Sequence, residues 1–312
     1  MAVPLADTQL TRYIADFNAQ ALPPAAALGA DALRAGTATR AVGRPPGPEM
    51  DRVVDVTMPP HGVGGRLYVP LEARDAIVVF LHGGGWVIGD LATHDRACRL
   101  LAARSRVPLL AVDYRRAPEH PWPAAVDDAV DAVRWLGSED AARLGPWSRV
   151  GIAGDSAGGT LAALACLRLR DDAAAVVPDA LVMAYANTDL AQSGASMRTE
   201  GHGYGLEVDD IEWFNAQWVP DPARRSDPGV SPLHAPRLDG LPPTVVVTCE
   251  HDPLRDQGEA FGDRLRAEGV PAVVRREPGM VHNFLLWDLV SPACAAALDR
   301  VADDLASVLA PA

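Results

Sequence analysis

The chain has 312 residues, of which 48% are hydrophobic and 22% are charged, a composition typical of a globular protein with a large core. Its formal net charge of −13 argues against nucleic acids or anionic membranes as partners, because no basic face is available to bind them. Four separate cysteines, with no CxxC pair and no zinc spacing, predict buried thiols rather than disulfides, and we expect no metal and no cofactor.

The first element in the chain is a helix. Leu10, Tyr13, Ile14 and Phe17 recur at helical spacing after a capping residue, which is Asp7 or Thr8. Because the N-terminus lacks the pattern of a secretory signal and no apolar run reaches about 20 residues, we expect a cytoplasmic protein. Residues 22–50 are rich in Pro, Ala and Gly and are expected to be irregular.

From about residue 51 onward, apolar strands alternate with helices. The strand segments are VVDVTM, GRLYVP, AIVVFLH, VPLLAVDY, RVGIAG, ALVMAYA, TVVVTCE and PAVVRREP. Four helices are expected between and after these strands. One begins after PWP, a second runs from Ser156 to about Arg170, and the other two cover 255–268 and 292–309. This alternation predicts an α/β fold, with a mostly parallel central sheet covered by helices on both faces.

One insertion interrupts the alternation. About 60 residues separate ALVMAYA from TVVVTCE, and within them LEVDDIEWFNAQWVPD has the pattern of an amphipathic helix. An insertion after a strand of a parallel sheet lies where such sheets bind ligands, so we interpret it as part of a helical cap. The predicted organisation is therefore an N-terminal cap segment (1–50), a core (51–189 and 231–312) and a cap insertion (190–230).

The segment GDSAG carries the first chemical signal. It fits G-x-S-x-G between a strand and a helix, the context in which a sharp turn raises a serine hydroxyl above a sheet. Upstream, HGGGW places three glycines directly after a buried strand. The N–H groups of Gly83, Gly84 and Gly85, with that of Ala157, could bind the oxyanion of an acyl-transfer intermediate.

A serine nucleophile needs a base and an acid that orients it. His61, His94, His202 and His234 are expected at the surface, His82 to brace the glycine loop, and His120 to be structural. His282 follows the last strand and is the predicted base. TVVVTCEHDPLRD offers Glu250, Asp252 and Asp256 as the acid, and Asp252 is favoured because it lies in the turn just past the strand.

These blocks, together with YRRAPEHPWPAA, resemble the hormone-sensitive-lipase family of carboxylesterases of the GDSAG type. The resemblance runs from about residue 50 onward and implies an α/β-hydrolase fold with a helical cap. It implies hydrolysis of short- to medium-chain carboxylic esters by water, with Ser156 as nucleophile, His282 as base and Asp252 as acid. One departure is Asn283, where many members have glycine after the catalytic histidine.

The substrate pocket and the assembly can also be predicted. We expect the substrate pocket to be formed by four aromatic side chains, namely Trp86, Tyr185, Phe214 and Trp218. Family members often pair through the edge strand, here PAVVRREP, so a homodimer is expected. The alternatives are a non-catalytic small-molecule receptor and an amidase or peptidase on the same fold.

Overall fold

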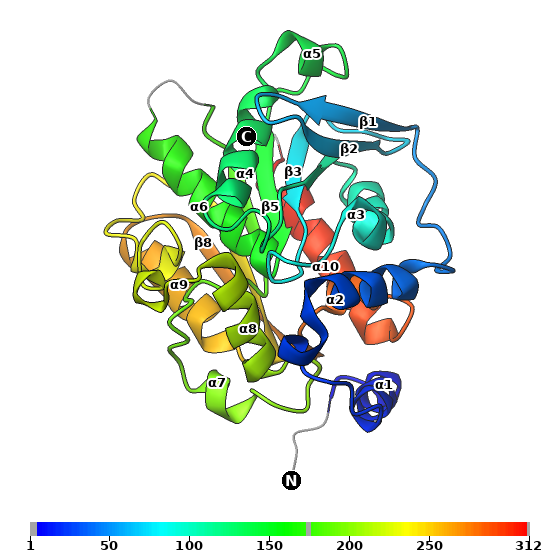
Figure 1. The fold of residues 1–312 in the computed structure, drawn as a ribbon. Helices are drawn as coiled ribbons and strands as arrows, with labels where there is room; N and C mark the ends of the chain where they lie inside the picture. Colours follow the sequence, from blue (N-terminus) through cyan, green and yellow to red (C-terminus); the bar gives the residue numbers. More distant parts are fainter. Residues whose placement is uncertain (1–4, 173–175, 311–312) are drawn as a thin grey trace.

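The computed structural model of the protein describes residues 5–172 and 176–310, and these residues are built around a sheet of eight strands (Figure 1). The strand order is β1-β2-β4-β3-β5-β6-β7-β8. β2 runs antiparallel to β1 and β4, and the strands from β4 through β3 to β8 are parallel to their neighbours. The strands are β1 (Arg52–Met58), β2 (Val63–Val69), β3 (Ile77–Leu81), β4 (Leu109–Asp113), β5 (Val150–Asp155), β6 (Ala180–Ala184), β7 (Thr244–His251) and β8 (Ala272–Val281).

Helices cover both faces of this sheet. α3 and α10 lie on one face, and α4, α6 and α9 lie on the other (Figure 1). The α-helices are α1 (Thr8–Ala19), α2 (Ala25–Ala41), α3 (Leu91–Ser105), α4 (Ala124–Trp135), α5 (Glu139–Ala142), α6 (Ala157–Asp171), α7 (Ser196–Thr199), α8 (Val208–Trp218), α9 (Arg255–Ala267) and α10 (Pro292–Val308). Short 3-10 helices are η1 (Pro222–Arg224), η2 (Pro232–His234) and η3 (Phe284–Leu286).

The alternation of side chains along the central strands explains the two covering layers. In β3, Val79 and Leu81 are buried in the cluster under α4 and α6, whereas Val78 and Phe80 are buried in the cluster under α3 and α10. Successive residues of a strand point to opposite faces, so a strand that is apolar throughout is stable only between two helical layers. The predicted α/β fold, with its mostly parallel sheet, is confirmed.

Two stretches differ from the sequence-based expectation. Residues 22–50 are not irregular throughout, because α2 occupies 25–41; its many alanines favour a helix, and Gly29 bends it with a φ of 76°. α3 was not predicted at all. It begins with a capping box in which Asp90 accepts from the Thr93 N–H while the Thr93 hydroxyl accepts from the Asp90 N–H.

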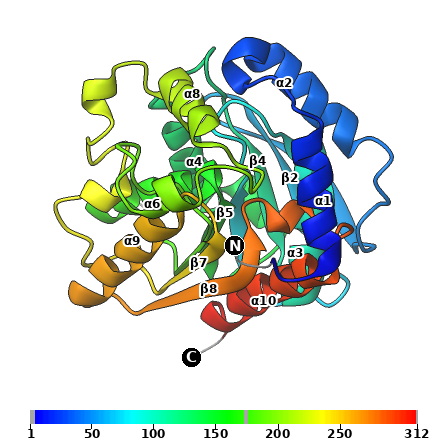
Figure 2. The same cartoon turned by 90° about the horizontal axis from the view of Figure 1, so that it is seen from below.

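α1, α2 and α8 gather over one end of the sheet, as the view from below shows (Figure 2). Two hydrogen bonds join the N-terminal helices to the insertion. The Asp210 carboxylate accepts from the Ala25 N–H at 2.8 Å, and the Asn18 side chain donates to the Gly203 carbonyl at 2.9 Å. The four cysteines are buried and free, as expected. Within the described residues, no helix is long and apolar enough to cross a membrane.

Candidate active site

The turn between β5 and α6 holds Ser156 in a conformation that serine rarely adopts. Its φ is 51° and its ψ is −122°, and its N–H donates to the Ala184 carbonyl at the end of β6 at 2.8 Å. Backbone in this region costs of order 1–3 kcal/mol and persists only where the surroundings enforce it. Gly158 allows the close approach, because a Cβ there would collide with the Leu81 carbonyl of β3.

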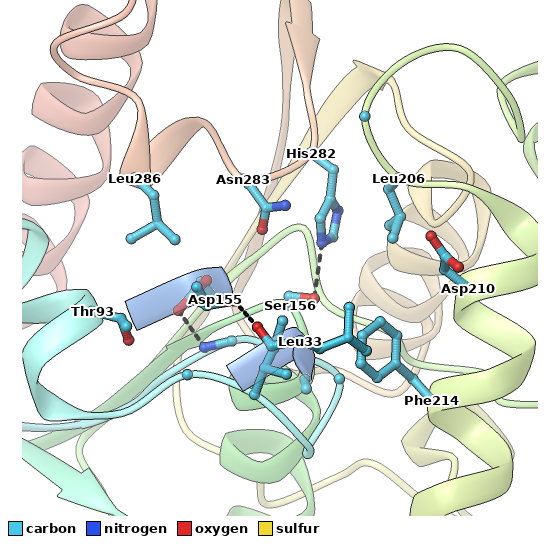
Figure 3. A pocket seen from close by; sticks show the side chains of 18 of the residues that line it. Leu33, Thr93, Asp155, Ser156, Leu206, Asp210, Phe214, His282, Asn283 and Leu286 are labelled. Carbon is cyan, nitrogen blue, oxygen red and sulfur yellow. Dashed lines mark hydrogen bonds between the residues drawn. The ribbon is translucent and has the colours of Figure 1, made fainter. Parts of the chain in front are cut away.

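Three side chains from three strand ends form one chain of hydrogen bonds, and Figure 3 shows the link between Ser156 and His282. The Ser156 hydroxyl lies 2.9 Å from His282 Nε2, and His282 Nδ1 lies 2.8 Å from Asp252 Oδ2. All three side chains are buried. The second oxygen of Asp252 accepts the Leu254 N–H at 2.8 Å, which fixes the carboxylate against the histidine. The structure therefore brings together the three residues predicted as nucleophile, base and acid.

The two other candidate acids point elsewhere. The Glu250 carboxylate accepts the Gly279 N–H at 2.7 Å, and the Asp256 carboxylate accepts the Ser196 N–H at 2.8 Å. Asp256 also pairs with Arg255 at 3.0 Å. Both carboxylates therefore bind backbone N–H groups of other segments and not His282.

The glycine loop after β3 lies beside the serine. The prediction that the Gly83 N–H binds an oxyanion is wrong. The Gly83 N–H donates to Asp155 Oδ1 at 2.8 Å, so it is not free to bind an oxyanion. Gly84 and Gly85 line the cavity in front of Ser156, as does Ala157. Ala157 opens α6, where an N–H has no acceptor within its own helix. Gly85 must lack a side chain, because a Cβ there would enter the Phe214 ring.

Asp155, which precedes the serine, belongs to a buried polar cluster that sequence reasoning missed. Besides Gly83, it lies 3.6 Å from His94 Nε2, and the Tyr185 hydroxyl lies 3.4 Å from its second oxygen. Burial would raise the pKa of Asp155, but His94 and the Gly83 N–H outweigh it and hold the pKa below its usual range. The cluster ties the glycine loop to the serine turn.

Two histidines lie near this cluster, and only one of them is placed as the sequence predicted. His82 braces the loop as predicted, with Nδ1 donating to the Gly83 carbonyl at 2.8 Å. His94 was expected at the surface and is instead buried, because α3 turns it toward Asp155. Burial, reinforced by the neighbouring His94, lowers the pKa of His82 to about 3, so His82 is neutral in the folded protein.

A cavity of about 260 Å³ opens in front of Ser156. Its walls come from the glycine loop, both N-terminal helices, α8 and the segment after His282, and include Tyr13, Phe17, Leu33, Trp86, Phe214, Asn283 and Leu286. Figure 3 labels Leu33, Phe214 and Leu286 around the serine. Asn283 has a φ of 68°, a left-handed conformation that glycine favours and asparagine tolerates.

Two of the four predicted pocket aromatics do not line this cavity. Trp218 is fully buried and stacks on Trp86 with ring centroids 4.1 Å apart, so it supports the wall from behind. Tyr185 packs against His282, with the two ring centroids 4.7 Å apart. Trp86 and Phe214 line the cavity as expected. Aromatic residues in a cap sequence do not reveal which ring faces the cavity and which packs beneath it.

The chain is similar in sequence and structure to known alpha/beta hydrolases and esterases. A family model of the alpha/beta hydrolase fold matches residues 78–286. The chain is 40% identical to the carboxylic ester hydrolase LipN of Mycobacterium tuberculosis over 77% of its own length and 66% of that protein's. It is 39% identical to an ethyl acetate hydrolase of Pseudomonas putida, over 72% of each chain. The solved structure of a hyperthermophilic esterase from Pyrobaculum calidifontis superposes with a TM-score of 0.89 at 34% identity, covering 98% of this chain and 99% of that one.

Proposed function

Because this chain belongs to the alpha/beta hydrolase family and is a carboxylic ester hydrolase, we propose that it is a serine esterase of the hormone-sensitive-lipase type that uses Ser156, His282 and Asp252. The observation that supports these roles is the continuous chain of hydrogen bonds from the Ser156 hydroxyl through His282 to Asp252. This chain of hydrogen bonds lies at the carboxyl ends of parallel strands, where open α/β sheets have their ligand-binding sites.

In the first half of the reaction, Ser156 Oγ attacks the ester carbonyl carbon while His282 Nε2 takes the hydroxyl proton. Negative charge develops on the carbonyl oxygen, and the proposed donors to it are the N–H groups of Gly84, Gly85 and Ala157, three residues that line the cavity. His282 then gives its proton to the departing alkoxide, so the alcohol leaves and an acyl group stays on the serine. Asp252 stabilises the imidazolium throughout.

In the second half, water replaces the alcohol. His282 takes a proton from water as its oxygen attacks the acyl carbon, and the proton returns to Ser156 as the carboxylic acid leaves. The free enzyme is restored without any net change in its protonation. The strained turn at Ser156 serves both halves, because it keeps the oxygen above the sheet and within reach of His282.

We propose short- to medium-chain acyl groups as the preferred substrates. The cap proposed for residues 1–50 and 190–230 contributes Tyr13, Phe17 and Phe214 to the cavity wall, and these rings restrict its length. A cavity of about 260 Å³ accommodates a small ester but not a long fatty acyl chain. The relative from Pseudomonas putida is named for a substrate of this small size.

The test of this function is the Ser156→Ala variant measured beside the wild type on p-nitrophenyl butyrate. We expect kcat to fall by about 10⁴- to 10⁶-fold, because the nucleophile is gone while the fold remains. A p-nitroanilide amide of the same acyl group should be turned over poorly by the wild type, which separates an esterase from an amidase. A purified, folded variant that keeps more than a few per cent of wild-type turnover would contradict the proposed role of Ser156.

Two further properties remain predictions. β8 is an edge strand of the sheet and exposes Val273, which supports pairing of two copies along this strand. Light scattering at several concentrations measures that state, and a monomer throughout would contradict it. Cytoplasmic location is likewise a prediction, which fractionation of the producing cell would test.

A further inference from the structure

Two arginines line the catalytic cavity without a carboxylate partner. The protein has 41 acidic residues against 28 basic ones, and most of its arginines form ion pairs. Among the residues that the structure describes, neither Arg40 nor Arg44 lies within 4.0 Å of a carboxylate oxygen. Arg40 donates to the Thr37 hydroxyl at 3.2 Å, which leaves its charge uncompensated.

Another arginine of the same helix shows what an anchoring role looks like. Arg34 donates to the carbonyls of Val87 and Ala117 at 2.8 Å each, and it binds both oxygens of Glu119. These bonds fix α2 to the loops beneath it. Within residues 5–172 and 176–310, Arg40 and Arg44 make no comparable hydrogen bonds to the core, so holding the helix in place does not account for them.

The stripe that carries these arginines begins beside the catalytic serine. Leu33, Thr37 and Arg40 follow at steps of four and three residues along α2, and Arg44 follows just after the helix ends; all four line the cavity that contains Ser156 (Figure 3 labels Leu33). At a rise of 1.5 Å per residue, the Cα of Arg40 lies about 10 Å farther along α2 than that of Leu33. A long guanidinium side chain can therefore meet the far end of a small ester whose reacting carbonyl is at Ser156.

The segment around Arg44 is held in place by its neighbours. Arg96 donates to the carbonyls of Pro45 and Pro46 at 3.1 and 2.8 Å, and its own charge is balanced by Asp288 at 2.7 Å. The positive charges of Arg40 and Arg44 act on the cavity wall, because both oppose the rise that burial causes in the pKa of Tyr13.

Two carboxylates line this cavity: Asp155 lies next to Ser156 and accepts the Gly83 N–H, and Asp210 lies at the opposite end of α2 from the two arginines. Asp210 accepts the N–H of Ala25, the first residue of the helix, whereas Arg40 and Arg44 lie at its last turn and just beyond. The cavity is thus negative at one end of α2 and positive at the other. Such a field orients a substrate that carries a negative charge on one side of its ester bond.

We propose that the preferred substrates of this esterase are esters that carry a carboxylate, which Arg40 and Arg44 bind while the ester carbonyl lies at Ser156. The carboxylate is not altered in the reaction; it positions the ester that water cleaves. This inference rests on the esterase function proposed above.

The experiment compares two pairs of esters that differ only in charge. The first pair is 4-acetoxybenzoate and 4-acetoxybenzamide, with the charge on the alcohol side. The second is monoethyl glutarate and the ethyl ester of glutaramic acid, with the charge on the acyl side. The ratio of kcat/KM for the charged over the neutral ester is measured for the wild type, for Arg40→Gln/Arg44→Gln and for a control, Arg198→Gln, which removes an arginine from α7 outside the cavity.

For at least one of the two pairs of esters, we expect the double variant to lower this ratio. The expected loss is about two- to fivefold for each arginine removed, which is the effect of a partly exposed ion pair. Raising the salt concentration should lower the wild-type ratio, and Arg198→Gln should leave it unchanged. A ratio that neither the double variant nor salt alters in either pair overturns the proposal. Turnover of p-nitrophenyl butyrate by the same wild-type preparation shows separately that the esterase function holds.

Discussion

Replacing Asp252 by Asn changes one atom in the buried chain of hydrogen bonds, and the structure indicates how the amide must lie. Asp252 Oδ1 accepts the Leu254 N–H, and Oδ2 accepts from His282 Nδ1. In the variant only one of these positions can remain an oxygen. If the NH₂ group faced Leu254, two donors would meet in a fully buried site, at a cost of about 1–3 kcal/mol.

The amide NH₂ group therefore faces His282. His282 Nδ1 must then accept a hydrogen bond, which places the ring proton on Nε2, the nitrogen that lies 2.9 Å from the Ser156 hydroxyl. A protonated Nε2 cannot take the serine proton. The corresponding substitution in a serine protease lowers kcat by about 10⁴ for the same reason, and we expect a loss of that order, about 5.5 kcal/mol in activation free energy.

The assay is kcat on p-nitrophenyl butyrate for the purified variant, with thermal unfolding measured alongside to confirm that it is folded. The matched controls are Glu250→Gln and Asp256→Asn, whose carboxylates accept backbone N–H groups away from His282. We expect less than about tenfold loss in either. Equal losses at positions 252 and 256, or an Asp252→Asn variant that retains a tenth of wild-type kcat, would refute the reasoning.

The remaining predictions concern pH and chain length. Burial holds the pKa of His82 at about 3, below its unfolded value of about 6.5. Its contribution to stability is therefore complete above about pH 6.5 and falls by about 1.4 kcal/mol per pH unit toward pH 3. Thermal unfolding from pH 7.5 to 4.5 should show a smaller acid loss in His82→Gln, and equal losses would contradict this. Among p-nitrophenyl esters, kcat/KM should rise about fourfold per carbon from acetyl toward hexanoyl and then fall. Phe214→Ala, which removes a ring from the cavity wall, should move the optimum to longer chains, whereas a wild type that prefers palmitoyl to butyryl esters would contradict the short cavity.

The residues whose positions could be predicted are those placed by local chain geometry. Ser156 needs a strand, a tight turn and a helix in succession, and all three are readable as an apolar run, small residues and a helical pattern. The same holds for the eight strands, because a strand buried on both faces appears as an unbroken apolar segment. Even Asp252 could be chosen over its neighbours from its place just after β7.

Features that depend on contacts between distant segments were not predictable. Nothing local in HGGGW shows that the Gly83 N–H is taken by Asp155, 72 residues later. The same limit applies to Trp218, which looks like its neighbour Phe214 in a helical pattern but stacks beneath Trp86. α3 differs from these features, because it could have been predicted. Its capping box and its buried positions at helical spacing are present in the sequence.

The bond between Ala25 and Asp210 has a consequence for how the protein is made. The two residues are 185 positions apart, and a ribosome that adds about 5–20 residues per second needs about 10–40 s to pass from one to the other. During that interval α1 and α2 exist without α8, and Tyr13, Phe17 and Leu33 lack the opposite wall of their cavity. The first helices to be synthesised thus wait longest for the partner that completes their cavity, and these apolar groups are the ones that a chaperone would meet on the nascent chain.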